Sequence, residues 1–178
     1  MLLPKRATTL LVNKATPILS LAYGFLPRKI ESFVLDHMIN TLSKEFIEHN
    51  ELEFMHNKIV KVAIPEMNVS WLFSKSNEED HKKERLVLIK DRHQKADVTF
   101  SGTLNAMILM ASQKVDPDTL FFNRELIITG DTNLGLEIKN LIDQFDISLL
   151  GLPIKKSLDI WSHSILEVKN DNAQRSVC

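Results

Sequence analysis

The sequence predicts one α+β domain, in which a sheet of five strands carries helices on one face and follows helices at the N-terminal end. Two observations support this fold class. Apolar residues recur at three- and four-residue spacing before and after a central region in which β-forming residues alternate. The chain has 178 residues, of which 44 % are hydrophobic and 25 % charged, and this size and composition suit one globular domain.

The first predicted element is an interrupted helix over residues 5–25, which Pro17 kinks or splits. A second helix runs from about residue 27 to residue 49, with Pro27 in its first turn. Its apolar residues predict a buried stripe made of Ile30, Phe33, Val34, Met38 and Leu42. His37 falls on the same side, so we expect it to be a core histidine rather than a ligand.

Four strands are expected next, over residues 58–64, 68–75, 85–90 and 96–102, with Val69, Trp71 and Phe73 on one face of the second. Residues 76–85 carry mixed charges and no aromatic side chain, which indicates a solvated hairpin loop.

The remaining chain alternates helical and strand patterns. A helix over residues 103–112 is apolar on more than one face, so it must be buried on more than one side. A fifth strand covers residues 124–129. Two helices follow over residues 132–145 and 153–168.

The charge is distributed unevenly, although the net charge is only −1. Residues 1–30 contain no Asp or Glu and five cations: Lys5, Arg6, Lys14, Arg28 and Lys29. A basic, amphipathic segment of this kind either lies on an anionic membrane surface or docks on its own domain. The single cysteine, Cys178, cannot form a disulfide within the chain. No apolar run near the start is long enough to span a bilayer. We expect a cytoplasmic protein that is at most peripheral on the inner face of the membrane.

Residues 130–135 (GDTNLG) lie between a strand and a helix, where phosphate-binding loops occur. They lack the Lys-Ser or Lys-Thr of a Walker loop and the three glycines of a dinucleotide loop. Asp131 already places a carboxylate at the positive end of the helix, where a phosphate would bind, and we predict that it is an N-cap.

The pair Asp116 and Asp118 raises the question of acid–base catalysis. Asp116 as an N-cap, with Pro117 in the first turn, is the simpler explanation. The chain has no Gly-x-Ser-x-Gly, HExxH or CxxC motif, and its histidine spacing fits no metal site. We therefore expect no catalytic residue, no metal site and no cofactor.

Large apolar side chains on the later helices all face the sheet. They fit two structures that the pattern alone does not separate: a tightly packed core, which is the more common outcome, or a cavity for an acyl or prenyl chain. The candidate cavity residues are Trp71, Phe73, Leu104, Met107, Met110, Leu120, Phe121, Phe122, Leu134, Ile138, Leu141 and Phe145.

The block DPDTLFFNRELIITGDTNLGLEIKNLID (116–143), together with ELEFMHNKIVKVAI and ADVTFSG, resembles the sterol-carrier-protein-2 (SCP2) lipid-binding domain. Within that family it is similar to bacterial accessory factors of ubiquinone biosynthesis. The resemblance covers roughly residues 45–146. It implies a mixed sheet whose last strand ends in a Gly-Asp or Gly-Asn turn before a helix that borders a lipid tunnel. The charged loop at 76–85 and the C-terminal helix depart from the family pattern, so partner contacts through these regions stay open.

The resemblance also implies a domain organisation and a function. Residues 1–45 would form a basic, amphipathic helical segment, 46–168 the lipid-binding domain and 169–178 a polar tail. The protein would be a non-catalytic factor of the oxygen-independent pathway that works with the iron–sulfur hydroxylase pair UbiU and UbiV. Its expected ligands are anionic phospholipid, such as phosphatidic acid, and isoprenoid quinone intermediates. The alternative is an interaction scaffold or a membrane-surface adaptor with a self-filled core and no lipid cargo.

Overall fold

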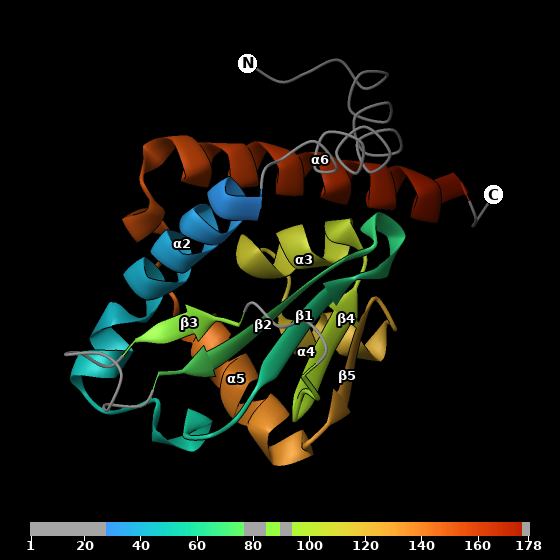
Figure 1. The fold of residues 1–178 in the computed structure, drawn as a ribbon. Coiled ribbons are helices and arrows are strands. Elements are labelled where there is room, and N and C mark those ends of the chain that lie inside the picture. The colour runs from blue at the N-terminus through green and yellow to red at the C-terminus, as the bar shows by residue number, and fades with distance from the viewer. Residues whose placement is uncertain (1–27, 77–84, 90–93, 176–178) are drawn as a thin grey trace.

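The computed structural model describes residues 28–76, 85–89 and 94–175. It shows the predicted α+β arrangement, with one five-stranded sheet and helices packed against it (Figure 1). Within these ranges the elements follow the predicted order, and the helix predicted over residues 5–25 lies outside the described residues. The helices are α2 (Arg28–Glu48), α3 (Leu104–Ala111), α4 (Pro117–Phe122), α5 (Thr132–Gln144) and α6 (Leu152–Arg175), with short 3-10 turns η1 (Glu53–Met55), η2 (Pro65–Met67) and η3 (Ile147–Leu150). The strands are β1 (Val60–Ile64), β2 (Val69–Lys75), β3 (Leu86–Leu88), β4 (Val98–Gly102) and β5 (Leu126–Gly130).

The sheet is mixed, with the strand order β3-β2-β1-β4-β5. β1 and β4 run parallel, and the other neighbours are antiparallel. Val62 is opposite Trp71 on one side and Phe100 on the other. Residues opposite one another in neighbouring strands point to the same face. Val69, Trp71 and Phe73, which were predicted to share one face of β2, therefore point to the face of the sheet that packs on the hydrophobic core.

Helix α3 is buried on more than one side, as its sequence predicts. Residues 106–110 are all buried, and Figure 1 shows α3 between the sheet and α6. The Thr103 side chain caps the helix by accepting a hydrogen bond from the Ala106 N–H at 3.1 Å. An apolar surface all around a helix is stable only when it is covered on all sides, and α6 provides the second cover.

Helix α6 continues to Arg175, beyond the predicted end at residue 168. Two ion pairs join it to the rest of the domain: Lys169 with Glu125, and Lys114 with Asp159 at 3.1 Å. The added turns lack an apolar stripe, so periodicity could not place this end. Lys, Ala and Gln in these turns are good helix formers.

The predicted stripe on α2 is wrong in its first half. Ile30, Phe33 and Val34 are 51 %, 73 % and 44 % exposed, and His37 is exposed rather than part of the core. The inward position at this end belongs to Glu31, whose buried carboxylate accepts a hydrogen bond from the Trp71 indole N–H. Spacing shows that a helix has an apolar face, but it does not show which of two faces meets the sheet.

Side chains of α2 also close the outer edge of β3. The Asp36 carboxylate accepts the Leu88 backbone N–H at 3.1 Å, and the Asn40 amide donates to the Leu86 carbonyl at 2.9 Å. An open strand edge invites pairing with another chain. Here a helix provides the missing hydrogen-bond partners.

The turn between β5 and α5 brings two backbone segments into contact. Gly130 has φ +102°, and a Cβ there would lie 2.2 Å from the Asp97 carbonyl oxygen. The next residue, Asp131, donates its N–H to that same carbonyl at 2.8 Å. Glycine is therefore required both by its backbone conformation and by the lack of space.

We predict that Gly130→Ala lowers the free energy of unfolding by about 2 kcal/mol or more, because it adds a steric overlap to an unfavourable φ. Gly151→Ala is the matched control, since Gly151 has φ +89° but its Cβ would meet only Pro153 at 3.8 Å. Gly151 has ψ 157°, and this combination of angles is essentially restricted to glycine, so the control should lose about 1–3 kcal/mol from backbone strain alone and Gly130→Ala should lose more. Urea unfolding of both variants measures the difference, and equal losses would contradict the steric argument.

Candidate functional site

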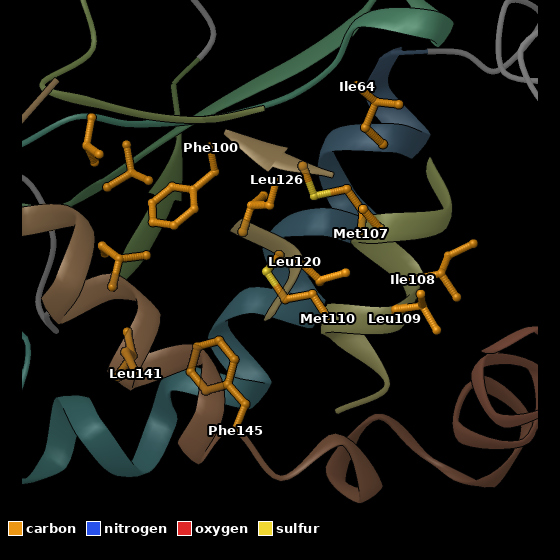
Figure 2. Packing of buried hydrophobic residues seen from close by; sticks show 14 of the residues in the cluster. Ile64, Phe100, Met107, Ile108, Leu109, Met110, Leu120, Leu126, Leu141 and Phe145 are labelled. Atoms are coloured by element: carbon orange, nitrogen blue, oxygen red, sulfur yellow. The ribbon is translucent and has the colours of Figure 1, made fainter. Parts of the chain in front are cut away.

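The side chains predicted to line a cavity come together mainly from α3 and α5. Met107 and Met110 lie on α3, and Phe145 lies at the end of α5. Together with Leu120, Leu134, Ile138 and Leu141 they are buried in one continuous hydrophobic cluster. Figure 2 shows Phe100 from the sheet, Met110 and Phe145 directed toward a common centre. Leu104 and Trp71 are partly buried and pack against the same cluster.

Helix α5 reaches this position because of its cap and its spacing. The Asp131 carboxylate accepts the N–H groups of Asn133 and Leu134, both at 3.1 Å, so the helix begins where predicted. Leu134, Ile138 and Leu141 then follow at four- and three-residue spacing on the inward face. A Cβ at Gly135 would lie 3.0 Å from a methyl carbon of Ile128 and 3.5 Å from one of Val98, so the absence of a side chain lets α5 approach the sheet closely.

Three predicted residues do not join this cluster. Phe121 and Phe122 are 45 % and 79 % exposed, and their rings contact each other edge to face at 5.9 Å. Their neighbour Leu120 is fully buried. Consecutive residues of a helix point about 100° apart, so one of the three apolar neighbours faces inward while the other two do not. Phe73 is half-buried and is not part of the cluster.

The structure adds interior residues that sequence reasoning did not select. The Phe46 ring of α2 contacts the Phe145 ring at 5.7 Å and 63°. Leu52 and Met55 near η1, and Ile165 of α6, are also buried in the cluster. Ile165 and Phe46 lie at helical spacing from other apolar residues, which was a usable signal. Leu52 and Met55 lie in a short turn region without periodicity.

The cations predicted to contact a membrane are only partly within the described structure. Lys5, Arg6 and Lys14 lie outside the described residues. Arg28 begins α2, and Lys29 beside it is exposed.

Two charged residues of α5 and its cap, Asp131 and Lys139, have shifted pKa values. Hydrogen bonding from the Leu134 N–H lowers the pKa of Asp131, and Lys58 at 3.5 Å adds to the shift. A hydrogen bond to the Asp118 carboxylate, at 2.8 Å, raises the pKa of Lys139 and ties α5 to α4. The predicted cap at Asp116 is confirmed by its 2.9 Å bond from the Asp118 N–H.

Among residues 28–76, 85–89 and 94–175, no group of three His, Cys, Asp or Glu side chains is arranged to hold a metal ion. Within these ranges no helix is both long and apolar enough to cross a bilayer.

A mixed sheet and helices that enclose one continuous apolar interior define a small α+β domain of the kind that can hold an apolar ligand. The model of the SCP-2 sterol transfer family matches residues 35–143. The chain belongs to this family, and the resemblance seen in the sequence is thereby confirmed.

Two comparisons add detail. The chain is 28 % identical over 148 residues to the ubiquinone biosynthesis accessory factor UbiT of Escherichia coli K12, a match that covers 83 % of this chain and 80 % of that protein. Its fold is similar to the solved structure described as "UbiJ-SCP2 Ubiquinone synthesis protein", with a TM-score of 0.52 and 13 % identity. That match covers 66 % of this chain and 93 % of the other, and it supports the fold alone.

The lowered pKa of Asp131 predicts how its cap responds to pH. A lowered pKa means that the ionised carboxylate stabilises the fold above about pH 4, the ordinary range of the group, and that this contribution disappears as the pH falls through the lowered pKa. Asp131→Asn keeps a capping oxygen without the charge. We expect the variant to be less stable than the parent at pH 7, and we expect this difference to shrink as the pH falls below the ordinary pKa range of the carboxyl group, as measured by urea midpoints. A difference that persists unchanged at pH 3 would contradict the charge argument.

Proposed function

We propose that this protein is a non-catalytic accessory factor of ubiquinone biosynthesis that binds lipid in its apolar interior and presents it to partner enzymes. Its ligands would be isoprenoid quinone intermediates, anionic phospholipid such as phosphatidic acid, or both. The observation that carries the proposal is the continuous apolar cluster between α3, α5 and the sheet, in a chain of the SCP-2 family that is similar to UbiT over most of its length.

The interior suits a prenyl or acyl chain for physical reasons. Each CH₂ group removed from water gains roughly 0.8 kcal/mol, so a polyprenyl intermediate strongly favours an apolar protein environment. Met107 and Met110 contribute two flexible side chains to one wall, and methionine adapts readily to ligands of different shape. The cluster is packed by its own side chains, so a ligand would enter by displacing them.

The finer parts of the proposal rest on the similarity to UbiT. They are a role in the oxygen-independent pathway, delivery to hydroxylases of the UbiU and UbiV type, and a location in the cytoplasm at the inner face of the membrane. The five cations within residues 1–30 support the last point. Each Lys or Arg held near an anionic bilayer contributes about 1 kcal/mol.

One observation favours a second candidate function. The interior residues at Met107, Ile138 and Leu141 are less than a tenth exposed, which also fits an ordinary core. The chain would then be an interaction scaffold, or an adaptor at the membrane surface, without lipid cargo.

Native mass spectrometry and lipid extraction of the purified protein distinguish the two functions. We expect a co-purifying quinone intermediate or phospholipid.

The double variant Met107→Leu, Met110→Leu keeps the core volume and should cost less than about 1.5 kcal/mol of stability, while the stiffer wall lowers the amount of bound lipid severalfold. Met38→Leu, on α2 and outside the cluster, is the matched control. A protein that carries no lipid under any purification condition would favour the scaffold.

A genetic experiment tests the pathway assignment. Deleting the gene in the organism that carries it should lower the ubiquinone content severalfold in cells grown without oxygen and leave it unchanged in aerated cells, since only the oxygen-independent hydroxylations would lack their accessory factor. Quinone extraction and chromatography give the readout. An equal loss in both conditions would contradict the oxygen-independent role while leaving lipid binding intact.

A further inference from the structure

The outward face of α2 carries a groove that the interior site does not use. Two adjoining hollows, of about 450 and 610 Å³, share His37, Asn40 and Lys44. The first hollow is completed by Phe33, Asp36, Ile47 and Arg85. The second continues toward the C-terminal end of α2 and reaches Leu149 of η3. The groove therefore runs along α2, between the edge strand β3 and η3.

Among the described residues that line the first hollow, cationic side chains outnumber acidic ones. Within the described part of the chain, the side chains of Lys44 and Arg85 have no hydrogen-bond or ion-pair partner. Among the residues that the structure describes, Asp36 is the one acidic residue that lines this hollow, and its carboxylate already accepts the Leu88 N–H. The acids Glu45 and Glu48 line only the second hollow. Two available cations thus face the same concave surface.

Asn40 provides a further polar group at the point where the hollows meet. Its amide nitrogen donates to the Asp36 and Leu86 carbonyls, at 2.7 and 2.9 Å. Its Oδ1 atom is buried and accepts no hydrogen bond from any residue in the described ranges. A buried oxygen without a donor is uncommon in folded proteins.

An apolar strip leads into the cationic end of the groove. Phe33 lines the first hollow together with Lys44 and Arg85. Ile30, one turn earlier on the helix, and Val34, the next residue after Phe33, are also exposed. Phe33 and Lys44 are eleven residues apart, or about 16 Å along the helix axis at 1.5 Å per residue. That span suits the head and the first part of the chain of one lipid-sized molecule.

We propose that this groove binds an amphiphile with an oxyanion head, a phosphate or a carboxylate. Lys44 and Arg85 hold the head by charge-assisted hydrogen bonds, and the apolar chain lies over Phe33 toward Ile30 and Val34. An amphiphile fits better than a free ion because an exposed aromatic ring lines the same hollow as the cations. The site is on the opposite side of α2 from the core, so it goes beyond the proposed function and holds whether or not the interior carries lipid.

Titration with water-soluble short-chain lipids tests the site. Dihexanoyl phosphatidic acid, dihexanoyl phosphatidylcholine and inorganic phosphate are added to the full chain below micellar concentration. Calorimetry gives the affinity, and backbone amide shifts give the location. We expect phosphatidic acid to bind most tightly and to shift the amides of α2 around residues 33–44. Lys44→Gln with Arg85→Gln should weaken it about tenfold or more, since bonds to charged groups are the stronger class.

The matched control is Lys95→Gln with Lys156→Gln, which removes the same charge from two exposed lysines outside the groove. It should bind phosphatidic acid as the parent does. Phe33→Ser separates the two sources of the anion, because it should weaken phosphatidic acid severalfold and leave inorganic phosphate unchanged. All substituted side chains are exposed, and thermal unfolding confirms that the variants fold.

Three results would overturn the proposal. They are an equal loss in the charge variant and its control, equal binding of phosphate and phosphatidic acid with no effect of Phe33→Ser, or no binding of either compound. Native mass spectrometry of the same charge variant keeps the two proposals apart. Lipid retained in the interior of a variant that has lost phosphatidic acid binding supports both sites, whereas an empty interior with an intact groove contradicts only the proposed function.

Discussion

The close contact between Gly130 and Asp97 fixes the geometry on which the interior depends. The Asp97 carbonyl accepts the Asp131 N–H at 2.8 Å, and its carboxylate accepts the Ile59 N–H at 2.7 Å. Lys58 lies 3.9 Å from the Asp97 carboxylate and 3.5 Å from that of Asp131. One residue thus joins the start of β1, the start of β4 and the turn from β5 into α5. These strands are far apart in sequence, and their relative position is decided at this junction.

The path of α5 follows from that junction. Because the turn is tight and Asp131 caps the helix at once, α5 crosses back over β4 and β5 with no intervening loop, and Gly135 allows it to lie close to them. Its inward apolar residues belong to the same cluster as Met107 and Met110 of α3, while α6 packs against α3. A few short-range contacts therefore position the elements that enclose the interior. The apolar side chains inside it have only to fill the remaining space.

Much of this could be predicted from the sequence, and the limits have physical causes. Alternation and helical spacing placed the elements, and local chemistry placed the caps at Asp116 and Asp131, because both signals act between near neighbours in the chain. Predictions that required knowledge of the surroundings were less successful. The apolar residues at the start of α2 and the ring of Phe122 are exposed, since exposure depends on which element covers a helix. The residues around η1 were missed because a single turn has no period.

Helix α2 distributes its polar and apolar residues in an unusual way. A helix with apolar residues on its outer face at one end, and a buried carboxylate on its inner face, departs from the usual pattern of a surface helix. Glu31 is retained inside because the Trp71 indole donates to it, and Asp36 and Asn40 are committed to the edge of β3. With these polar residues directed toward the sheet, the apolar ones of that half of the helix face outward. Because α2 closes the edge of the sheet, Phe33, Lys44 and Arg85 are left on one exposed groove. Covering the sheet does not by itself require a phenylalanine and two cations at these positions.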